Sequence, residues 1–450
     1  MTGMLGGAEV THIFAHDILS VLNAELLEAT VSGAQSYCER SLLLARPWDV
    51  VCLLNPLEES YLEYLQNLGI GPERGNIIPV GTSVRPDCST RLLNCLMANP
   101  DALSAIARLV TFSAKVVLSP YIASQSELEC TAVLQGALER SVELLGGNPH
   151  IVQLAKCKDV TRTKALELGV PVPEGEIVEL ELRRDGKPAD LRCLRDAIHR
   201  HLGRTGRAIV RGADGASGSS LFIVKSHSAS IEAALNRIAE RTDNHVYLIE
   251  TLLELTVSPN IMMHIAPGNG DITCVGITDQ ILNSRLMHQG NIYPSLAATL
   301  GDMMTSARSL CRWLQAEGYH GFAGFDFGEY VEQETGSPAH FLAEINPRMN
   351  GSVYPKALME YLNVLQRKAD RPPVEAFLSV NMKTRARSFA SLHESCGRLF
   401  FDPAKGSGFV PFNTGCLKLG KFAAALFGKS RHQVAGIYQE LATSLGGAWT

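Results

Sequence analysis

Three polar side chains alternate with apolar residues in the segment FLAEINPRMNGS, residues 341–352. Successive side chains of a strand point to opposite faces, so Glu344 and Asn346 are expected to project together. Arg348 follows the proline that ends the strand and can reach the same region. The segment therefore predicts a carboxylate, an amide and a guanidinium at one site.

A second carboxylate, Asp326, lies in the apolar segment GFAGFDFG at 321–328. Acids within apolar strands are costly to bury unless they are paired or bind a cation. Oxygens of Asp326, Glu344 and Asn346 suit Mg²⁺, which keeps few protein ligands and takes the rest from phosphate and water. A structural salt bridge to Arg348 is the alternative. The four residues together favour a site for magnesium and phosphate.

Two further segments have features of phosphate binding. The glycines and serines of RGADGASGSS, residues 211–220, let backbone N–H groups approach phosphate oxygens, although a flexible hairpin would look similar. Lys158, with Lys156 and Arg162, crowds the predicted start of a helix, where anions are favoured and cations disfavoured. An anionic ligand would explain these cations, and a solvated turn neutralised by Asp159 is the alternative.

The segment VYLIETLLELTV, residues 246–257, has Glu250 and Glu254 within an apolar stretch. This pattern suits a hinge whose backbone reads a base and whose carboxylate meets ribose hydroxyls. Glutamates at the ends of exposed strands are also common, so the pattern by itself leaves both interpretations open.

The segment RLMHQGNIYPS, residues 285–295, precedes the two acidic strands and is rich in polar side chains. An arginine there can clamp a carboxylate bidentately, and a peptide substrate needs such an anchor. An ordinary surface loop is the alternative. The candidate substrate-binding residues are Arg285, His288, Asn291 and Tyr293.

Short strands and helices are expected to position these residues. In the first third, buried strands are predicted at 48–54 and 115–118, with helices between and after them. The clearest helix is predicted over 127–145, with Ser126 and Glu129 spaced as a capping box. The alternation is typical of a small α/β unit.

Strands dominate the middle of the chain. A helix over 159–168 and a polar turn at 183–190 precede them. Strands are predicted at 208–210, 221–224, 246–249, 255–263, 321–327 and 340–345. The length predicts about three compact units, which we place at 1–150, 151–370 and 371–450.

The composition argues against a disordered, a nucleic-acid-binding or a membrane-spanning protein. Apolar residues make up 46% and charged residues 19%, as expected for a folded chain rather than a disordered one. The net charge is -5 and the basic residues are scattered, so nucleic acid is not an expected partner. No apolar stretch is long enough to span a membrane and no targeting segment stands out, so a cytoplasmic location is expected.

Cysteine and histidine spacing argues against a structural metal. The 11 cysteines occur singly with no CxxC pair, so we interpret them as small apolar core residues. His12 and His16 are four residues apart, as in a helical metal pair, but no further ligand lies at a recognisable spacing.

In their order along the chain, these segments resemble the ATP-grasp superfamily over about 153–354. The resemblance implies α/β and α+β structure: an ATP-grasp domain of two α+β subdomains clasping ATP, an N-terminal α/β domain and a small C-terminal domain. Arg211 stands where the superfamily usually has a second lysine, and its fork geometry differs from a point charge. The loop at 214–220 is similar to the lid that closes over the phosphates.

The resemblance also implies a role for each candidate residue. The ATP-binding residues would be Lys158, Arg211, Gly218, Ser219, Ser220, Glu250, Thr251, Leu253 and Glu254. The Mg²⁺ ligands would be Asp326, Glu344 and Asn346. Arg348 would be a catalytic residue. Arg285, from the polar segment at 285–295, is the second candidate catalytic residue.

The expected activity is that of an ATP-dependent ligase, which activates a carboxylate as an acyl phosphate and joins it to an amine, releasing ADP and phosphate. The overall layout resembles the peptide ligases of the pheganomycin pathway, implying an amino-acid-like carboxylate and a peptide or amino-acid amine, in peptide antibiotic biosynthesis. Alternatives are a small-molecule carboxylate-amine ligase, a carboxylase and a non-catalytic nucleotide-binding regulator. A homodimer is compatible with the sequence.

Overall fold

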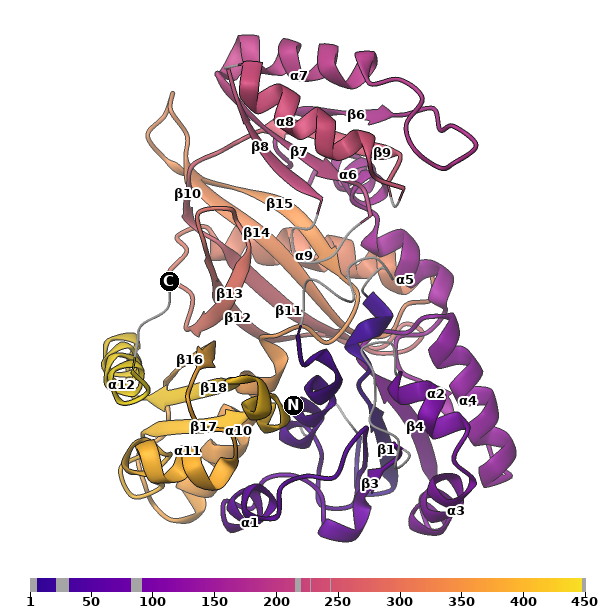
Figure 1. Ribbon diagram of the computed structural model, residues 1–450, viewed down its shortest axis with the longest axis vertical. Coiled ribbons are helices and arrows are strands. Elements are labelled where there is room, and N and C mark those ends of the chain that lie inside the picture. Colours follow the sequence, from indigo (N-terminus) through magenta and orange to yellow (C-terminus); the bar gives the residue numbers. More distant parts are fainter. Residues whose placement is uncertain are drawn as a thin grey trace.

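The computed structural model describes residues 6–21, 32–81, 91–214, 220–226, 228–242 and 244–446. The described strands form three sheets (Figure 1). An N-terminal parallel sheet and a small antiparallel sheet lie at opposite ends of the molecule, and the largest sheet extends from between them to the side of the N-terminal sheet. Within the described residues, no helix combines the length and apolar character required to cross a membrane.

The first sheet is parallel, with the strand order β3-β2-β1-β4-β5. Its strands are β1 (Val10–Ala15), β2 (Val50–Leu53), β3 (Ile77–Pro79), β4 (Lys115–Pro120) and β5 (Glu143–Leu144). The helical segments around it are η1 (Ile18–Val21), η3 (Ala34–Leu43), α1 (Glu59–Asn67), η4 (Arg74–Asn76), α2 (Leu92–Met97), α3 (Pro100–Leu109) and α4 (Gln125–Leu138). The apolar β2 is buried along its whole length, as expected for a parallel strand covered on both faces.

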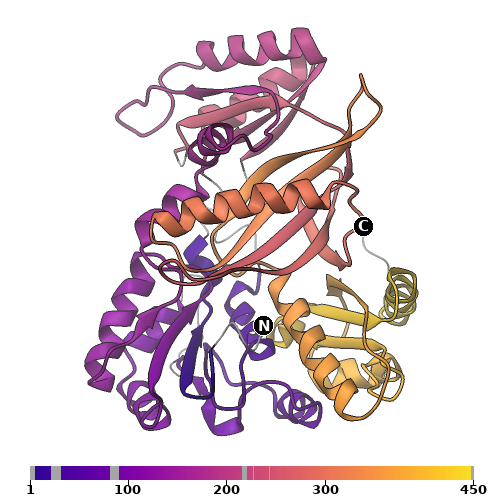
Figure 2. The ribbon, with the colours of Figure 1, turned by 180° about the vertical axis from the view of Figure 1, so that it is seen from behind.

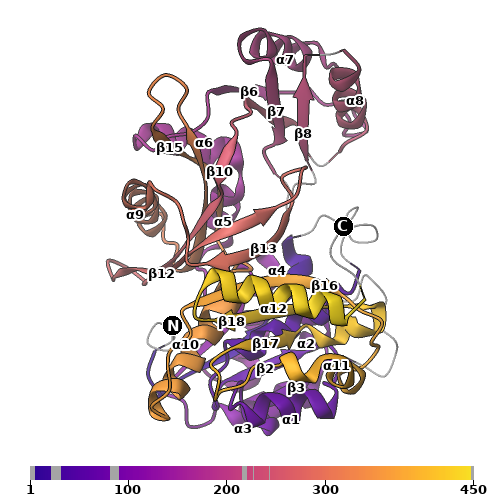
Figure 3. The same ribbon diagram turned by 90° about the vertical axis from the view of Figure 1, so that its left-hand side faces the viewer.

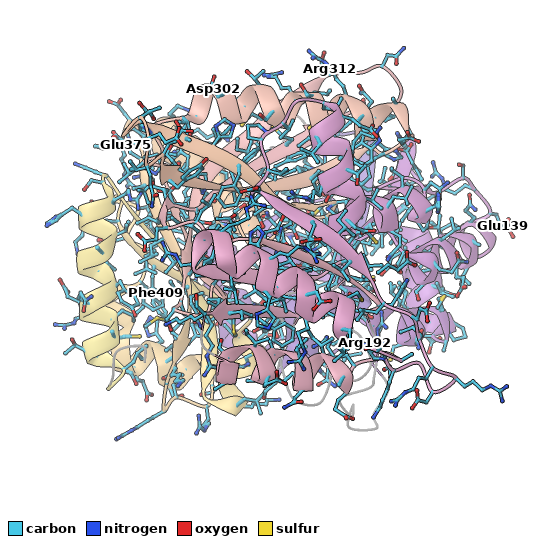
Figure 4. All side chains as sticks on the ribbon, turned by 90° about the horizontal axis from the view of Figure 1, so that it is seen from above. Glu139, Arg192, Asp302, Arg312, Glu375 and Phe409 are labelled. Atoms are coloured by element: carbon cyan, nitrogen blue, oxygen red, sulfur yellow. The ribbon has the colours of Figure 1, made fainter. Side chains whose placement is uncertain are left out.

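Helix α4 differs from the helix predicted over 127–145. Ser124 and Glu127 form the capping box, each two residues before the predicted positions. Glu139, exposed and labelled in Figure 4, ends the helix in a left-handed conformation with φ of 50°. The prediction was wrong at this end because the residues before the glycine pair at 146–147 belong to strand β5, which joins the parallel sheet.

The second sheet is antiparallel, with the order β6-β9-β7-β8. It consists of β6 (Gly175–Glu179), β7 (Arg207–Gly212), β8 (Leu221–Lys225) and β9 (Val246–Thr251), and carries α7 (Arg192–Thr205) and α8 (Ser228–Ala239). Both helices lie at the far end of the molecule (Figure 1). Helices α5 (Pro149–Lys156) and α6 (Lys158–Glu167) connect the first sheet to the second, so the helix predicted over 159–168 is confirmed to within one residue.

The third sheet has nine strands, with the order β10-β14-β11-β12-β13-β16-β18-β17 and β15 paired to β14. Its strands are β10 (Leu255–Val257), β11 (Pro259–Ile265), β12 (Ile272–Leu282), β13 (His288–Tyr293), β14 (Gly321–Val331), β15 (Pro338–Asn346), β16 (Ala376–Lys383), β17 (Gly408–Phe412) and β18 (Lys421–Gly428). The single strand predicted over 255–263 is two strands, broken at Ser258. β14 and β15 pair side by side, which sets the two acidic segments next to each other.

Helices pack on this sheet along its length. They are α9 (Leu300–Ala316), α10 (Val353–Lys368), α11 (Phe389–Cys396) and α12 (Arg431–Ser444), with short turns η5 (Gly397–Leu399) and η6 (Thr414–Leu419). Seen from behind, α9 crosses one face of the sheet (Figure 2). Turned sideways, α12 lies over β16 and β18 beside the first sheet (Figure 3).

The segment from 371 onward continues the third sheet, because β16 pairs with both β13 and β18. The predicted boundary at 370 therefore falls inside a continuous sheet. The division into 1–150, 151–370 and 371–450 remains a prediction.

Buried side chains form two large cores. One runs continuously from the first sheet into the third. The second sheet has a core of its own, in which Ile198 and Leu235 from its helices meet Val210 and Phe222 from its strands. The small sheet thus has an apolar core separate from the core that the first and third sheets share.

Candidate functional site

A cavity lies between the second and third sheets, and most of the predicted residues line it. From the second sheet and α6 come Lys158, Ile209, Arg211, Ser220, Leu221, Glu250, Thr251, Leu252 and Leu253. From the third sheet come Leu255, Gln280, Leu282, His288, Asp326, Phe327, Phe341, Ala343 and Glu344. Apolar side chains thus share the walls with a few charged groups, the composition typical of a small-molecule site.

The two acids are direct cross-strand neighbours, since Asp326 on β14 pairs with Glu344 on β15. Asn346 donates from Nδ2 to both, at 2.8 Å from Asp326 Oδ2 and 3.3 Å from Glu344 Oε1. Asn260 on β11 donates to the other oxygen of Asp326. The predicted group Asp326, Glu344 and Asn346 is therefore brought together on one wall of the cavity.

The pKa values of Asp326 and Glu344 are shifted in opposite directions. Removal from water, followed by the neighbouring Glu344 carboxylate, raises the pKa of Asp326 to about 7. Burial also opposes ionisation of Glu344, but Lys158 and Arg348 outweigh it and lower the pKa of Glu344. Two carboxylates whose mutual repulsion is only partly relieved provide the oxygen donors that Mg²⁺ prefers, so the residues fit this ion.

Arg348 lies beside the acids after the end of β15. Its NH1 donates to Asn346 Oδ1, and its Nε is 3.4 Å from the hydroxyl oxygen of Tyr121. In this arrangement the Asn346 amide oxygen faces Arg348 rather than the acids. The guanidinium therefore connects the acidic wall to the carboxyl edge of the first sheet.

Glu250 is in a different environment. Its carboxylate is buried between two guanidinium groups, with Arg162 NH1 at 2.7 Å from Oε1 and Arg211 Nε at 2.8 Å from Oε2. Arg211 NH1 also donates to the Ala343 carbonyl at 2.8 Å, which ties β7 to β15. Most of the bonding capacity of Arg211 is thus used within the protein, a difference from a lysine that would be free to reach a phosphate.

The lysines at the start of α6 are held by acids. Lys158 Nζ lies 3.5 Å from Glu344 Oε2, and Lys156 Nζ lies 3.0 Å from Asp214 Oδ1. The Lys158 backbone N–H donates to the Ala213 carbonyl at 2.9 Å, which brings the helix start against the end of β7. The Lys158 ammonium therefore lies directly beside Glu344 on the cavity wall.

The predicted hinge divides into residues inside and outside the cavity. Thr251 and Leu253 line it, and the Thr251 hydroxyl is 3.0 Å from His201 Nε2. The Glu254 side chain is 79% exposed, pairs with Arg207 at 2.6 Å, and is not among the lining residues. The structure thus brings the backbone hinge to the cavity, while the predicted ribose ligand points elsewhere.

The Gly/Ser loop is described only at its ends. Gly218 and Ser219 lie outside the described residues. Ser220 is buried and lines the cavity, and its hydroxyl donates to the Asp214 carbonyl at 3.3 Å. The end of the predicted loop therefore reaches the same wall as Arg211.

The segment at 285–295 is a strand and turn rather than a plain loop, because six of its residues form β13. His288 lines the cavity and Asn291 is buried nearby. Tyr293 instead stacks on Phe377, with ring centroids 5.5 Å apart, inside the sheet. Arg285 is exposed in the turn and is not among the lining residues, so the structure separates it from the acids.

Two residues at the site were missed by the sequence analysis. Asn260 bonds Asp326, and a polar residue within the apolar run PNIMM was an available signal. Tyr121 bonds Arg348 from 227 residues away along the chain. Only the packing of the first sheet against the third reveals that contact.

Sequence comparison and structural comparison gave different outcomes. No protein-family model matches the chain, and no curated protein matches it. In solved structures, N5-carboxyaminoimidazole ribonucleotide synthetase from Thermus thermophilus is 12% identical with a TM-score of 0.52, covering 98% of this chain and 100% of that one. Biotin carboxylase from Campylobacter jejuni is 13% identical with a TM-score of 0.53, covering 99% and 92%.

The chain has the ATP-grasp fold. An ADP complex of N5-carboxyaminoimidazole ribonucleotide synthetase is similar over 96% of this chain and 95% of that one, with 12% identity and a TM-score of 0.53. The similarity extends beyond the cavity to the parallel sheet and to the C-terminal strands. The predicted fold class, with ATP-grasp elements between an N-terminal α/β unit and a C-terminal piece, is confirmed.

Proposed function

We propose that this ATP-grasp chain is an ATP-dependent ligase that joins a carboxylate to an amine and releases ADP and phosphate. The observation that carries the proposal is the cross-strand pair Asp326 and Glu344, with Lys158 and Arg348 beside it, facing the hinge at 250–253 across one cavity. A site that only held a nucleotide base would not need two adjacent acids next to a guanidinium.

In the proposed reaction, a substrate carboxylate oxygen attacks the γ-phosphorus of ATP and the bond to the β-phosphate oxygen breaks. The products of this step are ADP and an acyl phosphate. An amine then attacks the acyl carbon, the bond from carbon to the phosphate oxygen breaks, and the amine loses a proton. The net result is an amide bond and free phosphate.

The residues of the cavity have separate tasks in this proposal. Backbone groups of Thr251 and Leu253 would bind the base, and Lys158 would bind phosphate oxygens. Oxygens of Asp326 and Glu344, with Asn346 beside them, would hold Mg²⁺, which when bound neutralises phosphate charge. Arg348 would stabilise the transferred phosphoryl group and then the oxyanion formed as the amine attacks. Apolar walls at Phe327 and Phe341 would exclude water from the acyl phosphate.

Within this class, we propose a peptide ligase that acts on an amino-acid-like carboxylate and a peptide or amino-acid amine, in peptide antibiotic biosynthesis. His288 on the cavity wall and Asn291 behind it support a polar substrate end on the β13 side. A homodimer is compatible with this role, which does not depend on one.

The test is a substrate panel that combines amino acids and short peptides as acids with the same compounds as amines. ADP release would be measured with ATP and Mg²⁺, and products would be identified by mass spectrometry. Turnover that requires both an acid and an amine supports the ligase. ATP binding without turnover across the panel would instead support a nucleotide-binding regulator.

The second candidate is a small-molecule carboxylase or ligase. It is favoured by the near full-length similarity to a biotin carboxylase and to N5-carboxyaminoimidazole ribonucleotide synthetases. Adding bicarbonate to the panel separates the two, because a carboxylase would release ADP with bicarbonate and an acceptor in the absence of any other acid.

A further inference from the structure

A group of aromatic and cationic side chains lies at the carboxyl edge of the first sheet, outside the cavity already described. Its members come from four elements or their ends. We call it the edge cluster, and it consists of His16, Tyr37, Arg40, Tyr121 and Tyr354.

The topology of the sheet accounts for its position. His16 follows β1 and Tyr121 follows β4, and these two strands are parallel neighbours with Ala15 opposite Pro120. β1 leads to β2 on one side, whereas β4 lies on the other, so the strand order reverses between them. Ligands of open α/β sheets bind outside the carboxyl ends of strands at such a reversal.

Arg40, from η3, is surrounded by rings. Its guanidinium carbon lies 4.7 Å from the Tyr37 ring centroid, 5.1 Å from that of Tyr354 and 5.7 Å from that of Tyr121. Its Nε is buried and has no hydrogen-bond partner within the residues that the structure describes. The Tyr121 and Tyr354 hydroxyls bond the same guanidinium, so its Nε is the donor left without a partner in the described part of the chain.

Two further cations lie close to the rings that surround Arg40. The Arg348 guanidinium carbon lies 5.7 Å from the Tyr121 ring centroid, and Lys421 Nζ lies 6.0 Å from that of Tyr37. The nearby acids are engaged elsewhere: Asp17 pairs with Arg91 at 2.7 Å, and Glu39 accepts from the Gly415 backbone N–H. No ion pair joins Arg40 to an acid of the described part of the chain.

A second observation points to a ligand. His16 is 1% exposed, and its Nδ1 is 3.1 Å from the Tyr354 hydroxyl, but its Nε2 is buried and has no partner among the described residues. Burial, followed by the charge of Arg40, lowers the pKa of His16 to about 3, so the imidazole is neutral. A buried polar nitrogen next to an incompletely bonded guanidinium is costly unless a ligand satisfies both.

We propose that the edge cluster is a binding subsite for an anionic group, a carboxylate or a phosphate, of the substrate that meets ATP at Arg348. Arg40 supplies the charge and its Nε donor, and Tyr121 supplies a hydroxyl shared with Arg348. This inference rests on the proposed function, because Arg348 links the subsite to the acids through Asn346. The substrate that reacts with ATP would therefore carry an anionic group of its own.

The experiment measures anion binding to the full chain loaded with a non-hydrolysable ATP analogue and Mg²⁺, so that the γ-phosphate position is filled. The melting temperature is followed with increasing inorganic phosphate in one arm and succinate in the other, at ionic strength held constant with sodium chloride. Stabilisation that saturates gives the dissociation constant of each anion.

The variants are Arg40→Gln, which removes the charge, and Arg184→Gln, a matched control at an exposed arginine in the 183–187 turn. We expect one anion to bind the unmodified chain, and binding to weaken by roughly tenfold to a hundredfold in Arg40→Gln but not in the control. Binding of phosphate alone assigns a phosphate-bearing substrate, and binding of succinate alone assigns a carboxylate.

Two outcomes overturn the proposal: neither anion stabilises the chain more than chloride, or Arg40→Gln binds as tightly as the unmodified chain. Binding of the ATP analogue is measured first. Its absence would contradict the proposed function itself, whereas analogue binding without Arg40-dependent anion binding contradicts only the subsite. If Arg40→Gln does not fold, Arg40→Lys keeps the charge without the fork and is expected to weaken binding severalfold.

Discussion

The two walls of the cavity surround their carboxylates differently: Glu250 is buried, whereas Asp326 and Glu344 are half-buried. On the small sheet, Glu250 is bonded by Arg162 and Arg211 on both of its oxygens. On the large sheet, Asp326 and Glu344 face each other, and the nearest cation is Lys158 at 3.5 Å from Glu344. In the first arrangement, guanidinium groups balance the charge of the carboxylate. In the second, Asp326 has a raised pKa and lies next to Glu344, a second acid.

The difference indicates that Glu250 stabilises the structure, whereas Asp326 and Glu344 are available to bind a ligand. A buried acid with two guanidinium partners gains nothing from an added cation. A pair of neighbouring acids gains much from one, because a divalent ion relieves their repulsion as well as their desolvation. The comparison therefore separates Glu250 from the proposed metal ligands although all three line the same cavity.

The Asp326→Asn variant tests the acidic pair on the large sheet, and we expect it to have the largest effect. Removing one acid should lower the rate of ADP release by about a thousandfold, equivalent to about 4 kcal/mol of transition-state stabilisation. The Mg²⁺-dependent gain in ATP affinity should also disappear. The melting temperature should change little, since the repulsion lost offsets the hydrogen bond lost. Calorimetric ATP titration with and without Mg²⁺ checks this, with the exposed Glu334→Gln as a control; an unchanged Mg²⁺ dependence would contradict the metal site.

The Glu250→Gln variant tests the carboxylate that two guanidinium groups bond on the small-sheet side of the cavity. Two buried guanidinium groups would lose their carboxylate, so the free energy of unfolding should fall by about 3 to 4 kcal/mol. Urea denaturation of the variant and of Glu334→Gln measures this. If stability is unchanged while ATP affinity is lost, Glu250 contacts the nucleotide instead of stabilising the sheet.

Glu39 extends the comparison to a buried acid that forms no ion pair with any described residue. Burial raises its pKa to about 7 from an ordinary value of 4.5, although the Gly415 N–H and Thr414 bond it. Because the folded-state pKa is raised, the stabilisation is full below pH 4.5 and is lost as the pH rises through 7. The loss is about 3 kcal/mol. Denaturation at several pH values should show this slope, and Glu39→Gln should flatten it; an equal slope in Glu39→Gln would exclude Glu39 as its source.

Arg211→Lys has the smallest expected effect of the four changes. A lysine cannot reproduce both the paired bonds to Glu250 and the bond to the Ala343 carbonyl, so stability should fall by about 1 to 2 kcal/mol. The KM for ATP should change by less than about threefold, a factor below about 1 kcal/mol. Thermal denaturation and the KM measurement check this together. A large rise in KM with an unchanged melting temperature would mean that Arg211 acts mainly on phosphate.

The acidic wall could be predicted from the sequence because its geometry is local. Alternation within one strand sets Glu344 and Asn346 on one face, and the apolar segment around Asp326 marks the strand next to it. The strands predicted at 321–327 and 340–345 are confirmed as parts of β14 and β15.

The other contacts of the site depend on which strands are neighbours in the sheets, and a local stretch of sequence does not show this. Arg211 meets Glu250 only because β7 and β9 are antiparallel neighbours with Ile209 opposite Glu250. β13 was missed because its sequence, HQGNIY, is polar and contains glycine, yet sheet neighbours on both sides hold it. The Tyr121 to Arg348 contact requires two different sheets to meet.

The separate core of the small sheet has a mechanical consequence. Across the cavity, the contacts that join it to the large sheet include the Arg211 bond to the Ala343 carbonyl and the approach of Lys158 to Glu344. Polar contacts of this kind exchange partners readily, whereas interdigitated apolar side chains do not. Pivoting of the small sheet would therefore leave both cores intact, and an incoming polyanion would compete for the same cations that hold the two halves together.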